Sequence, residues 1–454
     1  MPGVTMPDVI VILPGILGSV LEKNGHEVWG FSAGAGVRAI ASLGGSIQDL
    51  ELRADPDEEA DIGDHITAPR VLPDVHMIPG FWKIDGYTTI AKSIKKVFAV
   101  TPGQNYFEFP YDWRRQNRVA ALRLERQAKE WLYRWRASGH PNARLILIGH
   151  SMGGLIARYF LEARGGWEMT RTLITFGTPH RGAVNALNFI ANGWRKTMLG
   201  ATLLDLSALL RSLTSVYELL PTYKCCQQGG EMKHIKDVPI PHLDIQRLAK
   251  AAQFHADIAE GVDKRGRDFD NRVHPVVGTL QPTLQSARLE NGVLEALASF
   301  EGVDNAGDGT VPRVSATPLE LSDAGRDMFA PERHASLQNN DSVWGQVEGI
   351  LRTGQIDLAA FRLPLVQLTV QMDDAYTEDE PVRIMARGDA EDTPRLSGIF
   401  TRLEDGKPAA PLNFTAAEDG WQKLDAGPLE RGTYRVTVYG DARVRPVTDV
   451  FLVA

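Results

Sequence analysis

The residues with the clearest capacity for chemistry are a Gly-His-Ser-Met-Gly run at positions 149–153. This G-x-S-x-G pattern follows a strand-like apolar run that ends at Ile148 and precedes a helix-like apolar stretch over residues 155–161. A serine between a strand and a helix is typical of a nucleophile elbow, a strained turn that lifts the hydroxyl above a sheet. Glycine occupies the positions two residues to either side because larger side chains would clash there. We therefore predict that Ser151 is a catalytic nucleophile, with an ordinary glycine-rich turn as the alternative.

A serine hydroxyl is a weak nucleophile and needs a histidine base that an acid orients. In chains with this elbow the order along the sequence is serine, acid, histidine. His334 lies late in the chain, in a polar loop before a helix-like stretch over residues 343–351, and we predict that it is the base. A solvent-exposed loop histidine is the alternative. We expect His180 to have a structural role in its loop and His274 to pack at the start of a strand.

The acid that orients the base should lie between the nucleophile and His334. Asp308 stands between two glycines, which allow a tight loop that presents a carboxylate over a strand end. A Gly-Asp-Gly run by itself is more typical of a plain turn, so these residues alone leave the choice of acid open. The aspartates that precede His334 here are Asp304, Asp308, Asp323 and Asp327.

The oxyanion that develops during acyl transfer needs two hydrogen-bond donors. One donor is the backbone N–H of Met152, directly after the nucleophile. The second should come from an early junction between strand and loop, and the Leu-Pro-Gly-Ile-Leu-Gly-Ser run at positions 13–19 fits this place. We predict the N–H of Ile16 as the second donor, with a plain Pro-Gly turn as the alternative.

These residues must be positioned by short buried strands that alternate with helices. Each predicted strand is a short apolar run bounded by turn residues such as glycine and proline. Between strands, apolar residues from Leu124 to Trp135 recur at helical spacing. This alternation predicts an α/β fold with a mostly parallel sheet that helices cover on both faces. The predicted strands cover residues 9–13, 106–109, 145–148, 173–176 and 275–280.

The composition excludes several classes of protein. The 454 residues include 49 Lys and Arg against 57 Asp and Glu, and this net charge of −8 argues against a basic nucleic-acid-binding protein. Hydrophobic residues make up 43%, which argues against disorder. No stretch approaches the roughly 20 apolar residues of a membrane span. The two cysteines are adjacent, which excludes a disulfide framework, and no zinc pattern is present, so we expect no metal and no cofactor.

The N-terminal sequence bears on location. It carries neither a basic region nor a small-residue cleavage site, so we expect a cytoplasmic protein. The apolar run at residues 9–13 has only the length of a strand. Secretion by a route that needs no cleaved signal stays open as the alternative.

Charge is concentrated in two segments. Residues 51–64 hold seven acids and one arginine. We expect a solvated loop there, with a calcium site as the alternative, although no EF-hand spacing is present. Residues 114–136 hold eight bases and two acids. We expect these bases on the solvated face of a helix, with the binding of anionic head groups as the alternative.

Near residue 360 the pattern changes to short strands at close spacing. Tyr434 follows a Leu-Glu-Arg-Gly-Thr run and resembles the tyrosine corner of immunoglobulin-like sandwiches. We predict a catalytic domain over residues 1–355 and a small, immunoglobulin-like β-sandwich over residues 360–454. The sandwich is expected either to bind a protein partner or position the molecule, or to be a passive stabilising domain. Its predicted strands cover residues 366–370, 382–386, 399–403, 412–415, 434–439 and 450–453.

Further short motifs accompany the elbow, and they are Leu13–Glu22, Pro79–Phe81, Phe109–Arg114, Phe176–Gly182, Leu219–Pro221 and Gly307–Pro312. In this order they resemble the lecithin:cholesterol acyltransferase-like family of α/β-hydrolases, which includes lysosomal phospholipase A2 and diacylglycerol acyltransferases. The resemblance covers about residues 8–353 and implies an α/β-hydrolase fold with a helical cap or lid. It also implies that Ser151 is the nucleophile, Asp308 the orienting acid and His334 the base. By the same resemblance, Ile16 and Met152 supply the oxyanion hole.

The resemblance places the cap or lid at about residues 183–250, where apolar residues recur at helical spacing. An amphipathic lid would shield an acyl channel and contact a membrane surface. A core-packing excursion without mobility is the alternative. We expect Trp194 and Met198 of this insertion, together with Phe81 and Trp82, to line the substrate cleft.

These observations predict a serine-dependent lipid acyl-ester hydrolase, of the lipase or phospholipase kind, that works through an acyl-enzyme. A lipid acyltransferase that passes the acyl group to an alcohol needs the same residues and stays open. Two further alternatives are a non-catalytic lipid-sensing protein and an effector or toxin phospholipase that works through its C-terminal domain. The expected partners are a lipid or acyl-ester substrate, a membrane surface at the cap and a protein at the sandwich, but no nucleic acid.

Overall fold

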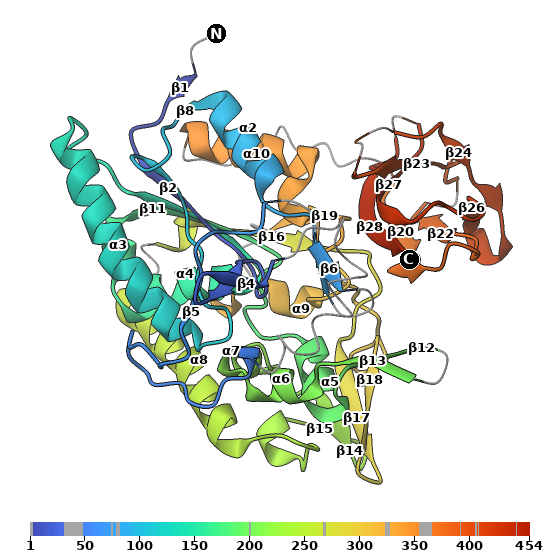
Figure 1. The fold of residues 1–454 in the computed structure, drawn as a ribbon, viewed down its shortest axis with the longest axis horizontal. Helices are drawn as coiled ribbons and strands as arrows, with labels where there is room; N and C mark the ends of the chain where they lie inside the picture. The colour runs from blue at the N-terminus through green and yellow to red at the C-terminus, as the bar shows by residue number, and fades with distance from the viewer. Residues whose placement is uncertain are drawn as a thin grey trace.

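The computed structural model describes residues 3–30, 49–73, 76–78, 82–198, 201–266, 269–322, 327–353, 366–390, 392–404, 406, 408–441 and 443–454. An α/β part and an all-β part lie side by side (Figure 1). Within these described ranges, no helix combines the length and the apolar composition needed to cross a membrane.

A six-stranded parallel sheet forms the centre of the α/β part (Figure 1). In spatial order its strands are β19 (Met328–Ala330), β16 (Val273–Gly278), β11 (Thr170–Phe176), β10 (Leu145–His150), β2 (Val9–Leu13) and β9 (Tyr106–Glu108). All strands but β19 were predicted, and the mostly parallel sheet of an α/β fold is confirmed. Strand β19 is three residues long and lies at the edge of the sheet.

Helices cover both faces of this sheet, and they are α2 (Thr88–Val97), α3 (Asn117–Ala137), α4 (Met152–Ala163) and α10 (Asp341–Thr353). Successive side chains of a strand point to opposite faces. In β2, Val9 and Val11 belong to the hydrophobic cluster that includes α3 and α4. Ile10 and Ile12 belong to the cluster that includes α2 and α10. The apolar run of β2 is therefore continuous because both of its faces are buried.

The insertion after β11 supplies four helices, α5 (Val184–Asn192), α6 (Ser207–Ser212), α7 (Thr214–Glu218) and α8 (Ile245–Arg265). The prediction of continuous helical spacing was partly wrong. Strands β12 (Arg195–Met198) and β13 (Ala201–Asp205) form an antiparallel hairpin between α5 and α6. Gly193, with φ of 72°, ends α5 and turns the chain out of the helix.

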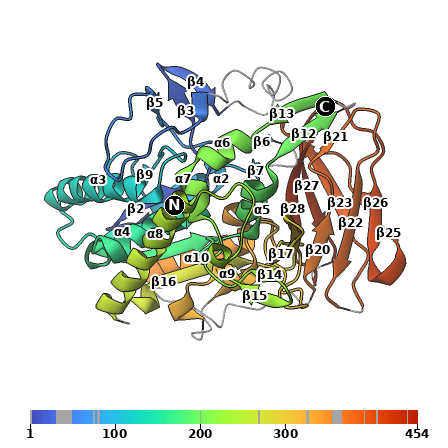
Figure 2. The ribbon, with the colours of Figure 1, turned by 90° about the horizontal axis from the view of Figure 1, so that it is seen from below.

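A small four-stranded sheet lies beside α5 (Figure 2), and none of its strands was predicted. In spatial order it contains β15 (Glu231–Lys233), β14 (Cys226–Gln228), β17 (Ser286–Glu290) and β18 (Val293–Leu297). Cys225 and Cys226 are buried and are not joined by a disulfide. The remaining elements of this part are β1 (Val4–Thr5), β3 (Leu21–Lys23), β4 (His26–Trp29), β5 (Ile66–Thr67), β6 (His76–Ile78), β7 (Trp82–Ile84), β8 (Phe98–Ala99) and α9 (Arg313–Ala316).

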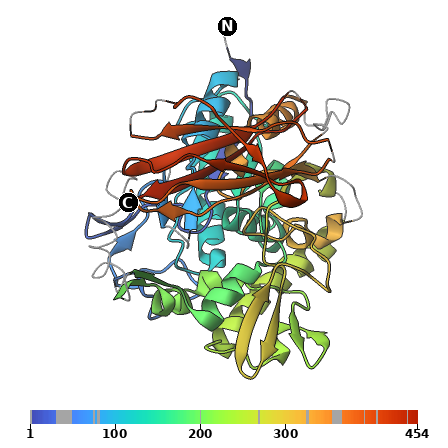
Figure 3. The same ribbon diagram turned by 90° about the vertical axis from the view of Figure 1, so that its right-hand side faces the viewer.

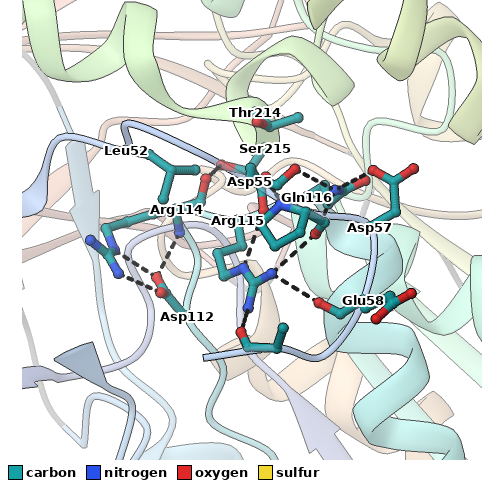
Figure 4. A network of polar contacts seen from close by, with 12 residues as sticks. Leu52, Asp55, Asp57, Glu58, Asp112, Arg114, Arg115, Gln116, Thr214 and Ser215 are labelled. Carbon is teal, nitrogen blue, oxygen red and sulfur yellow. Dashed lines mark hydrogen bonds and ion pairs between the residues drawn. The ribbon is translucent and has the colours of Figure 1, made fainter. Parts of the chain in front are cut away.

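The acidic segment is held against the start of α3 (Figure 4). Arg115 contacts Asp55 (Nε–Oδ1 3.1 Å) and donates to three backbone carbonyl groups of the segment. The backbone N–H of Gln116 donates to the other oxygen of Asp55 at 2.8 Å. Arg114 is fully buried and pairs with Asp64 at 2.6 Å. The predicted solvated loop and solvated bases were therefore wrong for these residues, because opposite charges far apart in sequence neutralise each other. The prediction is correct for other charged residues of the two segments, such as Asp61 and Lys129, which are exposed.

These ion pairs also bear on the calcium alternative. Asp55 and Asp64 already face arginines, so their carboxylates are engaged. In the part of the chain that the structure describes, no group of three or more His, Cys, Asp and Glu side chains is arranged to hold a metal ion.

The C-terminal part consists of two mostly antiparallel sheets packed face to face (Figure 3). One sheet contains, in spatial order, β20 (Leu368–Gln371), β22 (Arg383–Gly388), β26 (Gln422–Asp425) and β25 (Thr415–Ala416). The other contains β21 (Ala375–Tyr376), β28 (Val447–Val453), β27 (Gly432–Tyr439), β23 (Ser397–Arg402) and β24 (Leu412–Asn413). Buried residues of both sheets, such as Leu424 and Phe451, share one hydrophobic cluster. This confirms the predicted β-sandwich.

Tyr434 forms the predicted corner of the sandwich, since its hydroxyl donates to Glu430 O at 2.9 Å. Strands β21 and β26 were not predicted. The expected boundary between the domains falls mostly on residues 354–365, outside the described ranges. The division into residues 1–355 and 360–454, with a cap at about 183–250, therefore stays a prediction.

Candidate active site

Ser151 lies on the sharp turn between β10 and α4. Its backbone has φ 52° and ψ −125°, a combination that is strained for any residue with a side chain. Two hydrogen bonds hold the turn in place. The N–H of Ser151 donates to Phe176 O at 2.8 Å, and Thr178 Oγ1 donates to Ser151 O at 2.9 Å. The end of β11 and the residues after it therefore help to maintain the strained turn that places Ser151 at the cavity.

The glycines of the elbow are required by close contacts between backbones. A Cβ at Gly149 would lie 2.6 Å from the Cα of Gly154. A Cβ at Gly153 would lie 2.4 Å from the carbonyl oxygen of Leu13, at the end of β2. Both distances are shorter than real Cβ contacts, which confirms the prediction that larger side chains would clash at these two positions.

His334 and Asp308 form a hydrogen-bonded pair, although their loops come from different parts of the chain. His334 Nδ1 lies 2.7 Å from Asp308 Oδ2. The other carboxylate oxygen, Oδ1, accepts the N–H groups of Thr310 at 2.9 Å and Val311 at 2.7 Å. An ionised carboxylate can only accept, so Nδ1 of His334 carries the proton and Nε2 is the basic nitrogen.

Two glycines at strand ends make room for this pair. Gly177 follows β11 with φ of 52°, and a Cβ there would lie 2.6 Å from Asp308 Oδ2 and 2.9 Å from His334 Nδ1. A Cβ at Gly278, the last residue of β16, would lie 2.2 Å from the Cβ of Asp308. The sequence analysis assigned neither glycine a role. The available signal was a glycine directly at the end of each apolar strand.

Both predicted oxyanion donors lie next to Ser151. A Cβ at Gly15 would lie 3.0 Å from the Cβ of Ser151, so the loop after β2 runs directly beside the nucleophile. Ile16 follows in this loop and lines the same cavity as Ser151. Met152 is the first residue of α4, where backbone N–H groups have no acceptor within the helix. The role of Ile16 and Met152 as oxyanion donors stays a prediction.

A buried chain of hydrogen bonds, which the sequence analysis missed, links this loop to His334. The N–H of Gly15 donates to Tyr87 Oη at 2.7 Å, and Oη lies 3.0 Å from His150 Nδ1. His150 Nε2 lies 3.0 Å from His334 O. Because a carbonyl only accepts, Nε2 carries the proton and Nδ1 accepts from the tyrosine. Burial, with the neighbouring His334, lowers the pKa of His150 to about 3, so the ring stays neutral.

A cavity of about 420 Å³ opens beside Ser151 and His334. Trp194 lies in its lining, and its predicted role in substrate binding stays a prediction. Arg333 and, from the C-terminal sandwich, Asp374 add polar groups that the sequence analysis missed. The apolar part of the lining includes Ile16, Leu17, Trp29, Phe189, Leu206 and Leu210. The cavity thus joins the reactive groups to an apolar wall that the insertion largely supplies.

The remaining candidates for the substrate cleft cannot be placed. Phe81 lies outside the described residues, and so do the side chains of Trp82 in β7 and Met198 in β12. Their roles stay predictions. His274 is buried in β16, as expected.

The alternative acids have other partners. Asp304 accepts from Gln285 Nε2 at 2.5 Å, and Asp327 accepts from Thr317 Oγ1 at 2.9 Å. Asp323 lies outside the described residues. Asp308 is the aspartate that faces His334 in the described structure.

The sequence resembles a known family. Residues 80–249 match the family model of lecithin:cholesterol acyltransferase, which confirms the resemblance found in the sequence motifs. The matched segment includes the elbow and most of the insertion. No curated protein matches the chain by sequence.

Solved structures with similar arrangements have low sequence identity. A lipase of Bacillus licheniformis, BlEst2 in its propeptide form, is 12% identical with a TM-score of 0.38, and the similarity covers 100% of this chain and 95% of that chain. Phospholipase PlaB of Legionella pneumophila, in complex with thio-NAD, is 11% identical with a TM-score of 0.20, covering 98% and 89%. A CARDB domain of Pyrococcus furiosus is 11% identical with a TM-score of 0.16, covering 21% and 91%.

Proposed function

We propose that this chain, which resembles lecithin:cholesterol acyltransferase over residues 80–249, is a serine-dependent lipid acyl-ester hydrolase that acts through an acyl-enzyme. One observation carries the proposal: the strained Ser151 elbow and the Asp308–His334 pair meet at one cavity with a largely apolar lining. A cavity of about 420 Å³ is within the range of small-molecule binding sites, and its apolar wall suits a long acyl group.

In the proposed reaction Ser151 Oγ attacks the carbonyl carbon of the ester while His334 Nε2 takes the hydroxyl proton. Asp308 accepts the Nδ1–H of His334 and stabilises the imidazolium that forms. The backbone N–H groups of Ile16 and Met152 bind the oxyanion. His334 then protonates the departing alcohol, and the acyl-enzyme remains. Water, deprotonated by the same histidine, attacks the acyl carbonyl. The bond from the carbonyl carbon to Ser151 Oγ then breaks, His334 returns the proton to Oγ, and the fatty acid is released.

The first test is the replacement Ser151→Ala in the full-length protein. We expect ester hydrolysis to fall by about 10⁴-fold or more, because the nucleophile is lost. Labelling by a fluorophosphonate probe should disappear as well, while the circular dichroism spectrum stays that of the wild type. Ser322→Ala, at an exposed position, is the matched control and should keep both activities. Persistent labelling of the Ser151→Ala variant would assign the chemistry to another residue.

The second test concerns the acyl group. Each buried methylene contributes about 0.8 kcal/mol, so kcat/KM for p-nitrophenyl esters should rise by up to about fourfold per added CH₂ until the cavity is full. Trp194→Ala should reduce the gain for long chains and leave acetyl ester hydrolysis nearly unchanged. Phosphatidylcholine vesicles should also be substrates. A preference for acetyl esters, with no hydrolysis of vesicles, would contradict a lipid substrate and indicate a small-ester hydrolase.

A further inference from the structure

The C-terminal sandwich contacts the two loops that carry Asp308 and His334. It lies beside the end of the central sheet where β16 and β19 are found (Figure 1). Strands β20 and β28 supply the contacts described below. Some of these contacts fall on Glu332 and Arg333, directly before His334, and the others fall on Leu280 and Gln281, which lie beside Gly307 and Asp308 in the fold.

Glu332, two residues before His334, is anchored by the sandwich. Its Oε1 accepts the N–H of Thr448 in β28 at 3.2 Å and the N–H of Arg333 at 2.9 Å. Its Oε2 accepts Nδ2 of Asn340 at 3.0 Å. Burial raises the pKa of Glu332 to about 8, so the group is costly to bury and the three hydrogen bonds offset part of that cost.

Arg333, directly before His334, reaches both sheets of the sandwich. Its guanidinium donates to the carbonyl oxygen of Val370 in β20, and its Nε lies 3.4 Å from Asp449 Oδ2 in β28. The side chains of Arg333 and Asp449 are 16% and 1% exposed. The two groups interact as opposite charges rather than through a hydrogen bond from Nε. Removing one partner of a buried ion pair leaves the other charge uncompensated, so Arg333 depends on the charge of Asp449.

Gln281 connects the acid loop to the same part of the sandwich. Gln281 is fully buried, and its backbone N–H donates to Gly307 O at 2.9 Å, immediately before Asp308. Its Nε2 donates to Leu368 O in β20 at 3.2 Å. Thr369 Oγ1 of the same strand donates to Leu280 O at 2.8 Å.

We propose that the sandwich positions His334 for catalysis, and that Arg333, held by Asp449 of β28, is the positioning residue through which it acts. This inference rests on the proposed role of His334 as the base. The sandwich fixes the backbone on the N-terminal side of the histidine, while the Tyr87–His150 hydrogen bonds fix its carbonyl oxygen. A small displacement of the ring would separate Nε2 from the serine hydroxyl, and a shift of about 1 Å can cost about 100-fold in rate.

Asp449 offers the cleanest test of this role. Arg333 lines the cavity, so its replacement also alters substrate binding. Asp449 belongs to the sandwich and lies outside the described lining of the cavity. An effect of Asp449 on the chemical step must therefore pass through another residue. Arg333 contacts Asp449 directly, whereas the pKa of Glu332 is raised by burial and, to a smaller extent, by the charge of Asp449, so the double variant is needed to identify the route.

The experiment compares full-length Asp449→Asn, Arg333→Gln and the double variant with the wild type. Asp425→Asn is the matched control, since Asp425 is exposed on β26 and pairs with Arg383 at 3.4 Å. The measurements are kcat and KM for a soluble ester, the rate of labelling by a fluorophosphonate, and the thermal unfolding midpoint. We expect Asp449→Asn to lower kcat and the labelling rate by about tenfold or more, with KM within about twofold of the wild type. The double variant should lose no more kcat than Arg333→Gln, and Asp425→Asn should behave as the wild type.

Other outcomes overturn the inference. Wild-type kcat in Asp449→Asn with a lowered unfolding midpoint would make the contact purely structural, and additive losses in the double variant would separate Asp449 from Arg333. If Asp449→Asn does not fold, Arg333→Lys replaces it, because lysine keeps a charge facing Asp449 but lacks the planar fork that serves both partners. A loss of kcat at constant KM in that variant supports the inference, and wild-type kcat refutes it. A wild type that neither hydrolyses esters nor reacts with the probe would refute the proposed function itself.

Discussion

At the scale of single residues, hydrogen bonds determine which nitrogen of each histidine carries a proton. Asp308 accepts from Nδ1 of His334 and leaves Nε2 basic, as a general base requires. The carbonyl of His334 in turn accepts from Nε2 of His150. His334 therefore carries its proton on Nδ1, which leaves Nε2 free for proton transfer, whereas His150 carries its proton on Nε2 and holds the carbonyl of His334.

The residue-scale prediction concerns the acid. Asp308→Asn should lower kcat by about 10⁴-fold, because an amide cannot hold the imidazole in the required tautomer. Asp304→Asn is the matched control and should keep activity within a few-fold, since its oxygen can still accept from Gln285. Steady-state kinetics on a soluble ester would measure both. A severe Asp304→Asn variant beside a mild Asp308→Asn variant would show that the wrong acid has been chosen.

At the scale of elements, the acidic segment acts as a brace between α3 and the insertion. Leu52 N donates to Ser212 Oγ of α6 at 3.0 Å, and Lys250 of α8 contacts Asp57 at 3.1 Å. The same segment engages Arg115 at the start of α3 (Figure 4). Because α6 supplies Leu209 and Leu210 to the cavity lining, the contact of the segment with α6 supports the region that we propose for the acyl chain.

The element-scale prediction is that Asp55→Ala destabilises this brace by about 3 kcal/mol. The carboxylate is buried, and its loss removes the charge that faces Arg115 and leaves the N–H of Gln116 without its acceptor. Asp61→Ala, at an exposed position of the same segment, should change stability by less than about 0.5 kcal/mol. Urea unfolding followed by tryptophan fluorescence would compare the two. Equal midpoints for both variants would contradict the brace.

At the scale of the whole molecule, buried neutral histidines link folding to pH. Burial lowers the pKa of His150, His180 and His255, which lie in or beside β10, β11 and α8. An unfolded histidine binds a proton as the pH falls through about 6.5, whereas folded His150 resists until about pH 3. Between these values the unfolded state binds more protons, so the native state loses stability as the pH is lowered.

The molecule-scale prediction is therefore acid sensitivity well above the titration range of ordinary carboxylates. Between pH 7 and pH 5, His150 alone should lower the free energy of unfolding by about 2 kcal/mol. His150→Gln should reduce the number of protons taken up on unfolding by nearly one, so the free energy of unfolding should depend less steeply on pH. His26→Gln, at an exposed position, is the control and should leave this slope unchanged. Urea unfolding at several pH values measures the slope. An unchanged slope in His150→Gln would show that the ring is already protonated in the fold.

Several features could be predicted from the sequence because they depend on near neighbours in the chain. The strained turn at Ser151 needs only glycines two residues away and a strand and helix on either side. Strand β2 is recognisable because both of its faces are buried, which leaves a continuous apolar run. The corner at Tyr434 closes on Glu430, four residues away. Local sterics and periodicity carry this information, and a single sequence displays both.

Other features were decided by the tertiary structure, because they join segments far apart in the chain. The hairpin β12–β13 formed where apolar spacing suggested helix, since pairing outweighed propensity after Gly193. The acidic segment pairs with arginines about 60 residues away, and Arg333 pairs with Asp449 of the C-terminal sandwich. No pattern within a single segment contains these partners. These ion pairs form because burying a charge is costly unless the completed fold brings an opposite charge beside it.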